Sequence, residues 1–156
     1  MKVGWATTPS AAHQATYFFK NSGFEYVFLT SLGRAYHQAG DVGKVLYIAR
    51  QVPDGDFQSA YNALIAAGHE ARALAEESAN GKHVESARQA YLWAQNFYDA
   101  ATYFADGTGD PARIRTAWQW MDDCWLKSGR GRERRSPPTG RAPRRARGRN
   151  RAGTCR

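Results

Sequence analysis

The sequence predicts an all-α fold, a helical bundle built on one long antiparallel helix hairpin and followed by a disordered, arginine-rich C-terminal tail. Small and apolar residues recur every three or four positions through residues 54–104, and no segment shows strand alternation over more than a few residues. Residues 1–127 carry a net charge of −2, whereas residues 128–156 carry +10 and no large apolar side chain. We therefore expect a helical domain over 1–127 and a disordered tail over 128–156.

The hairpin is the element that organises the body. Asp56 can cap its first helix, and Gly81 is expected to end that helix in the left-handed conformation. The repeating positions are Phe57, Tyr61, Leu64, Gly68, Ala71 and Ala75 in the first helix and Val84, Ala87, Tyr91, Ala94, Tyr98 and Ala101 in the second. Small residues opposite aromatic ones let two helices approach closely. We expect burial of Tyr61, Leu64, Leu74, Tyr91 and Tyr98 between the two helices.

Shorter helices are predicted on both sides of the hairpin. One begins at Thr8-Pro9 and reaches about Lys20. A second opens at Ser22 with the capping-box spacing to Glu25. Its expected inward residues are Phe24, Phe28, Leu32 and Tyr36. A third spans residues 42–50. The last helix follows Asp110-Pro111 and carries Ile114, Ala117, Trp118, Met121 and Trp125 on one stripe.

Targeting and membrane signals are absent from the sequence. Residues 1–10 lack the apolar run of a signal peptide, and no stretch approaches the roughly 18 apolar residues of a membrane span. Cys124 and Cys155 lie in regions of different composition, so we expect no disulfide between them. The expected location is the reducing cytoplasm, and no membrane partner is expected.

The basic tail allows two interpretations. Arginine neutralises phosphate groups, so the tail could be an arm that binds nucleic acid or an acidic membrane. Arg, Gly, Pro and Ala are also the residues of GC-rich codons, and lysine is absent from residues 128–156. Out-of-frame translation of a GC-rich gene gives this composition, and we favour that interpretation. Nucleic acid is expected as a partner only through the tail.

Several short motifs of the body occur in the order and spacing of a known family. They are DGDFQSAY at 54–61, AEES at 75–78, SARQAY at 86–91 and NFY at 96–98. Together they resemble the N-terminal helical region, or cap, of α/β-hydrolases similar to 2,6-dihydroxypseudooxynicotine hydrolase. Fermentation-respiration-switch esterases and fungal polyketide-shortening hydrolases belong to the same broad group. The resemblance covers about residues 17–125. Ala60 and Leu64 stand where the family usually has tryptophan.

This resemblance implies a function that needs a second domain. In such hydrolases a serine, assisted by His and Asp, attacks an ester or a carbonyl beside a C–C bond, and the helical region covers the cleft. It implies four candidate substrate-lining residues: Tyr91, Asn96, Tyr98 and Trp118. The alternative, which we favour, is that these four residues belong to the interhelical core. A small-molecule substrate is expected only when a catalytic domain is present.

No catalytic residue, metal ligand or cofactor site is expected within the chain itself. No serine stands in a Gly-x-Ser-x-Gly nucleophile elbow, and no βαβ units are visible. His69-Glu70 is half of a zinc motif, but Ala73 occupies the position of the second ligand. We therefore expect a hydrolase segment that is truncated before the catalytic domain and inactive alone. Self-association through exposed apolar surface is a further expectation.

Two other function classes stay open from the sequence. A tetratricopeptide-like interaction module fits the hairpin lengths, although no second copy at a period of about 34 residues is visible. Nucleic-acid binding through the arginine-rich tail is the other.

Overall fold

The computed structural model describes residues 18–133, in which helices are joined by short connections. The helices are α1 (Ser22–Gly33), α2 (Val42–Gln51), α3 (Phe57–Asn80), α4 (Val84–Ala105) and α5 (Ala112–Glu133), with short 3-10 helices η1 (Arg34–His37) and η2 (Asp106–Thr108). Residues 18–133 contain no strand, so the all-α prediction is confirmed. The start of the helix predicted from Thr8 and most of the predicted tail lie outside the described residues.

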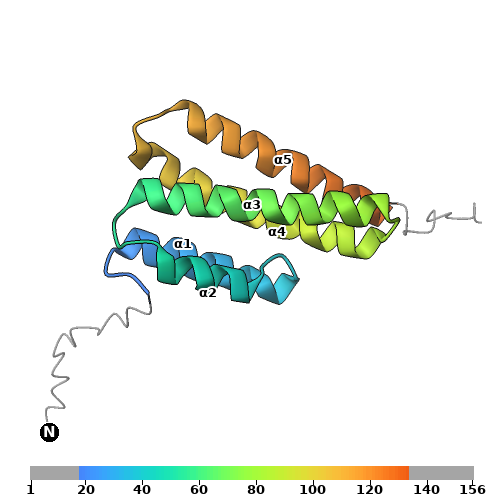
Figure 1. Ribbon diagram of the computed structural model, residues 1–156, viewed down its shortest axis with the longest axis horizontal. Coiled ribbons are helices and arrows are strands. Elements are labelled where there is room, and N and C mark those ends of the chain that lie inside the picture. Colours follow the sequence, from blue (N-terminus) through green and yellow to red (C-terminus); the bar gives the residue numbers. More distant parts are fainter. Residues whose placement is uncertain (1–17, 134–156) are drawn as a thin grey trace, which may run out of the picture.

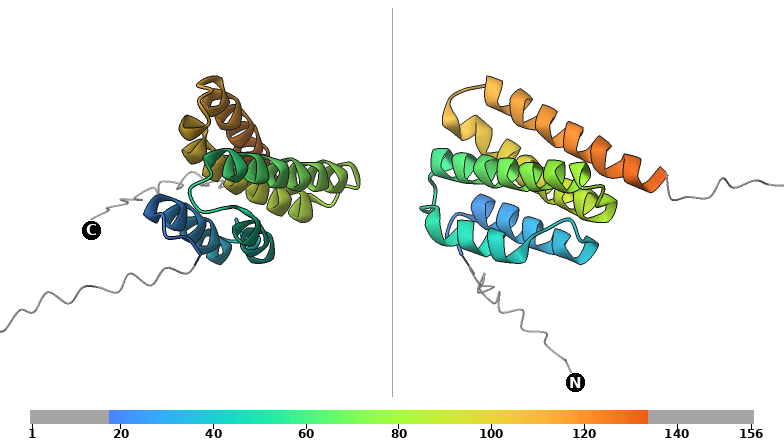
Figure 2. Two further views of the ribbon diagram at one scale, coloured as in Figure 1. Left: turned by 60° about the vertical axis from the view of Figure 1, so that its left-hand side comes forward. Right: turned by 45° about the vertical axis from the view of Figure 1, so that its right-hand side comes forward.

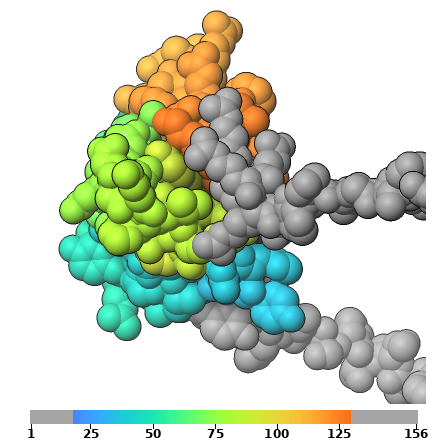
Figure 3. Space-filling view, turned by 90° about the vertical axis from the view of Figure 1, so that its right-hand side faces the viewer, coloured from blue at the N-terminus to red at the C-terminus, as the bar shows by residue number. Residues whose placement is uncertain are grey.

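The helices form three layers around the central hairpin. Helices α3 and α4 lie side by side in the middle, α1 and α2 lie below them, and α5 lies above (Figure 1). Two further views keep this order (Figure 2). The space-filling view onto the end where α3 turns into α4 also shows α5, the hairpin and the segment that includes α2 as successive layers (Figure 3). The hairpin is therefore covered on both of its faces (Figure 1 and Figure 2).

The predicted hairpin is present, and its start and its close packing follow the sequence. The Asp56 carboxylate accepts a hydrogen bond from the Ser59 backbone N–H at 2.9 Å and caps α3. Gly68 faces the Tyr98 ring, where a Cβ would lie 2.4 Å from the Tyr98 Cε1 atom. Four of the five predicted interior residues are buried: Tyr61, Leu64, Tyr91 and Tyr98.

Two details of the hairpin were predicted wrongly. Leu74 is 46% exposed, because the inward face of α3 at that level is formed by Ala71 and Ala75, and Leu74 lies off that face. Gly81 has a φ of −74°, and the left-handed residue is Lys82 at +60°. The turn is thus shifted by one residue from the predicted one.

The start of α1 also differs from the sequence prediction. Asn21, not Ser22, caps the helix, because its Oδ1 accepts from the backbone N–H groups of Gly23 and Phe24 at 3.0 and 3.3 Å. Glu25 reaches backward and accepts from the Phe18 and Phe19 N–H groups at 3.1 and 3.0 Å. Residues 18–20 are therefore non-helical and precede α1 directly. The prediction of a helix that reaches Lys20 is wrong for these residues.

Helix α1 buries its two phenylalanines as predicted, but Tyr36 is not part of it. Phe24 and Phe28 are fully buried and pack on Phe104 of α4, with ring centroids 4.7 and 6.2 Å from it. Leu32 is partly buried against the core. Tyr36 was expected inside but is 89% exposed, because α1 ends at Gly33 and the chain continues as the 3-10 helix η1.

Helix α5 turns inward three residues of the predicted stripe, Ile114, Ala117 and Met121, but not its two tryptophans. Ala117 and Cys124 are fully buried, whereas Trp118 and Trp125 are 54% and 57% exposed. The tryptophans follow the buried positions by one residue, which is a rotation of about 100° around the helix. The helix also continues past Lys127, and Ser128 is buried with its Oγ donating to the Trp125 carbonyl at 2.7 Å.

Candidate functional site

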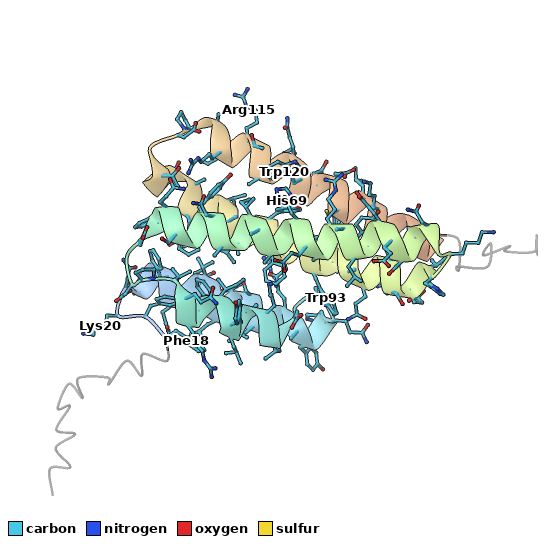
Figure 4. The ribbon with its side chains drawn as sticks, in the orientation of Figure 1. Phe18, Lys20, His69, Trp93, Arg115 and Trp120 are labelled. Atoms are coloured by element: carbon cyan, nitrogen blue, oxygen red, sulfur yellow. The ribbon has the colours of Figure 1, made fainter. Side chains whose placement is uncertain are left out.

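The densest group of polar and aromatic side chains lies where α3, α4 and α5 meet. His69 of α3 and Trp120 of α5 pack edge to face with ring centroids 4.7 Å apart, and both contact Tyr98 of α4 (Figure 4). The Tyr98 hydroxyl and the His69 Nδ1 atom are 2.8 Å apart and share a hydrogen bond. This bond gives the buried hydroxyl the partner that a phenol inside a protein requires.

Burial makes the two acidic protons near this cluster hard to remove. Desolvation raises the pKa of Tyr98, whose side chain is fully buried. Desolvation also raises the pKa of the Cys124 thiol to about 11, although Arg72 opposes the shift. A neutral thiol is a poor nucleophile, so Cys124 packs as a small apolar residue rather than serving as a reactive group.

Arg72 links this cluster to the surface. Its guanidinium pairs with Glu76 at 3.0 Å, one turn along α3, and with Asp123 of α5 at 2.9 Å. The hydrogen bond to Glu76 is the main cause of the raised Arg72 pKa. The Arg72–Glu76 pair follows from the sequence spacing of four residues, but the pair with Asp123 requires knowledge of how α5 crosses α3. The network ties α3 to α5 and pairs both of its carboxylates with Arg72.

The four candidate substrate-lining residues are not brought together. Tyr98 and Asn96 are fully buried in different directions, because Tyr98 meets α3 and α5 whereas Asn96 donates from Nδ2 to the Ser31 carbonyl of α1 at 3.2 Å. Tyr91 is 8% exposed and lies beneath the Lys127 ammonium, 5.5 Å from its ring centroid. Trp118 faces outward from α5. Three of the four residues thus contribute to packing between helices.

Several surface hollows have the size of a small ligand, and two of them lie beside exposed aromatic side chains. One of about 220 Å³ lies between α1 and α4 and is bordered by Tyr26 and Tyr103, with the Arg34–Asp99 ion pair at its edge. Another of about 250 Å³ lies between α4 and the end of α5 beside Leu92 and Trp125. None of the four candidate residues lines either hollow. Sequence periodicity did not indicate these hollows, because they form between helices distant in sequence.

The described residues contain no grouping of side chains suited to a metal ion. Within residues 18–133, no three His, Cys, Asp or Glu side chains are grouped so as to hold a metal ion. No helix in that part of the chain has the length and apolar character needed to cross a membrane. His69, which begins the incomplete zinc motif, is instead hydrogen-bonded to Tyr98, as expected for a structural histidine.

Curated fungal hydrolases are similar to this chain over about 100 residues. The "Hydrolyase poxO" of Penicillium oxalicum is 35% identical over 110 residues, which is 69% of this chain and 26% of the relative. The "Alpha/beta hydrolase psoB" of Aspergillus fumigatus is 36% identical over 86 residues, covering 54% of this chain and 19% of the relative. The "20-hydroxy-prefusarin hydrolase FUS2" of Gibberella moniliformis is 34% identical over 99 residues, covering 64% and 24%.

These matches confirm the resemblance to α/β-hydrolases that the short motifs indicated. The chain spans about a quarter of the length of the first of these relatives. No family model matches the chain, and no solved structure matches it. The chain is therefore homologous to one segment of fungal hydrolases, and that segment is all-helical here over residues 18–133.

Proposed function

We propose that this chain is the helical cap segment of a serine α/β-hydrolase and that it requires a catalytic domain to act on an ester or a C–C bond. The observation that carries the proposal is the match to several hydrolases, each over only about a quarter or less of the relative. A segment of that size accounts for a cap but not for the strands and the nucleophile elbow of a hydrolase.

The proposed role of the helices is to cover and shape a pocket rather than to perform chemistry. Tyr98 and Asn96 fix α4 against its neighbours, which supports a positioning role for that helix. Tyr26 and Tyr103 leave large aromatic area exposed beside the hollow between α1 and α4, where a second domain or a substrate can be contacted. The buried free thiol of Cys124 fits the proposed cytoplasmic location.

Labelling with a fluorophosphonate probe tests the first half of the proposal. The purified chain should remain unlabelled, because no serine in the sequence stands in a nucleophile elbow. A chimera in which residues 18–133 replace the matching segment of the Penicillium oxalicum relative should be labelled and should cleave a p-nitrophenyl ester. Labelling of any serine in the isolated chain would refute the claim that it is inactive alone.

A matched pair of leucine variants tests whether the folded segment is what restores activity. Leu64 is 1% exposed and Leu74 is 46% exposed, and both belong to α3. In the chimera, Leu64→Ala should lower the temperature at which ester cleavage is lost, whereas Leu74→Ala should leave it nearly unchanged. A chimera no more active than the relative with its segment deleted would count against the cap assignment.

The interaction-module alternative gains no additional support. The described residues contain one long hairpin, α3–α4, followed by a single helix, and the matched relatives are named hydrolases. Nucleic-acid binding would depend on the arginine-rich segment, of which residues 134–156 lie outside the described part. A gel-shift measurement over a range of salt concentrations is the direct test of that activity.

A further inference from the structure

Four side chains on one face of α5 have no partner within the described part of the molecule. They are Arg115, Trp118, Asp122 and Trp125, spaced by three, four and three residues along the helix. This spacing places them on one face. Trp118 and Trp125 are 54% and 57% exposed, and no side-chain hydrogen bond, ion pair or ring contact joins any of the four to another residue of 18–129. We call this set the α5 outer face.

The apolar part of this face has the composition of a protein contact. A single exposed tryptophan is unremarkable, but two tryptophans two turns apart on one helix face expose a large apolar area on the same side of the molecule. Tryptophan is also among the residues that contribute most to binding energy at interfaces. The hollow of about 250 Å³ bordered by Leu92 and Trp125 continues this surface toward α4.

The charges on the α5 outer face are arranged symmetrically about Trp118. Arg115 precedes it by one turn and Asp122 follows it by one turn, and Figure 4 shows the Arg115 side chain directed away from the bundle. Consider two α5 helices packed antiparallel across a two-fold axis between positions 118 and 119. Arg115 of each copy then faces Asp122 of the other, and the two Trp118 side chains meet near the axis.

We propose that the α5 outer face is a self-complementary contact through which two copies of this chain form an antiparallel dimer. A two-fold contact uses the same patch on both copies, so it requires opposite charges at positions related by the axis. Arg115 and Asp122 meet this requirement, and the exposed tryptophans supply the apolar contact. Because one helix face is a small interface, the dimer belongs to the weak, micromolar class.

Sedimentation equilibrium of the full chain, at about 5–200 µM and roughly 0.15 M salt, measures this association. Arg115→Glu and Asp122→Arg should each weaken the dimer by roughly tenfold or more, because each places like charges opposite each other twice. An equimolar mixture of these two variants should associate again, since both cross-axis pairs of the mixed dimer are then opposite in charge. The double variant R115E/D122R should also recover.

Aromatic variants provide the second arm of the test. Trp118→Ser should weaken the dimer, whereas Tyr36→Ser should not, although Tyr36 is 89% exposed and therefore more accessible than either tryptophan. Circular dichroism of each variant verifies that the helices remain folded. A chain that is monomeric throughout the concentration range would overturn the proposal. So would a dimer that is indifferent to Trp118→Ser, or two charge variants that fail to associate when mixed.

Discussion

Cys124 illustrates how a single side chain responds to the interior built around it. It is fully buried in α5, beside the cluster of Tyr98, His69 and Trp120. The thiolate form would lie in this desolvated environment, and Arg72 and Lys127 compensate its charge only in part, so the pKa rises from the ordinary value of 9.0 to about 11. The folded state therefore prefers the protonated thiol.

Stability should consequently decline in alkali. An unfolded thiol loses its proton near pH 9, whereas the folded one keeps it until about pH 11, so the contribution is complete below pH 9 and is lost as the pH rises to 11. In a Cys155→Ser background, the unfolding free energy should decrease between pH 9 and pH 11. The additional Cys124→Ala change should make that decrease smaller by roughly 2 kcal/mol. Urea unfolding at several pH values measures it, and parallel curves for the two proteins would contradict the prediction.

Helices α3 and α4 form the closest contact between elements, and that contact depends on one glycine. The Tyr98 ring lies over Gly68, where a Cβ would be 2.4 Å from the nearest ring atom. The ring cannot easily retreat, because Tyr98 is fully buried and its hydroxyl is held by His69. Gly68 is therefore required by packing and not by backbone conformation.

This distinction predicts opposite effects for two glycine-to-alanine changes. In an open helical position, alanine is favoured over glycine by up to about 1 kcal/mol, and a Cβ added at Gly33 of α1 would have no atom within 4 Å. Gly33→Ala should thus stabilise the protein. Gly68→Ala should destabilise it by about 1–3 kcal/mol, because the added methyl group overpacks the contact with Tyr98. Thermal unfolding monitored by circular dichroism compares them, and a stabilised Gly68→Ala protein would refute the packing argument.

The sequence predicted elements better than it predicted the faces they bury. Asp56 and Gly68 mark α3 through local chemistry, so that helix and its partner α4 were predictable. Leu74 and Trp118 were misplaced because each depends on the exact rotation of a helix against its neighbours, whereas Tyr36 was misplaced because α1 ends at Gly33. A rotation of 100° per residue moves a side chain from core to surface, and a hydrophobic pattern containing many small and aromatic residues does not fix it that finely.

The candidate site was predictable only in part, for a related reason. The Arg72–Glu76 pair follows from the local spacing of four residues along one helix, and it is present. The packing of Trp120 on His69 and the Arg72–Asp123 bridge were not predictable, since they join helices about 50 residues apart in sequence. Only the crossing of α5 over α3 determines them.

At the scale of the whole molecule, helix α5 extends across the point where the composition changes. It continues to Glu133, and Ser128 is 3% exposed against the rest of the bundle. The division predicted between residues 127 and 128 stays a prediction about evolutionary origin. Residues 128–133 nevertheless belong to the helix, and Ser128 takes part in its packing.

Two shortened chains test the contribution of these residues. A chain that ends after Lys127 loses buried Ser128 and the last turns of α5, so its unfolding free energy should fall by about 1–2 kcal/mol relative to the full chain. A chain that ends after Glu133 should match the full chain within about 0.5 kcal/mol. Denaturant unfolding measures both, and equal stability of the two shortened chains would contradict the prediction.

The order in which the helices pack has a consequence for synthesis on the ribosome. Helix α3 packs chiefly on α4, and α4 on α5, so each large contact joins helices that emerge one after the other. Such local pairing favours rapid folding of the hairpin as soon as α4 is available. Helix α1 can pack in its final position only after α4 has been synthesised. Its contacts with α4, from Ser31 to Asn96 and from Arg34 to Asp99, each join residues 65 positions apart. Until α5 emerges, the face of the hairpin that α5 later covers is therefore exposed and accessible to chaperones.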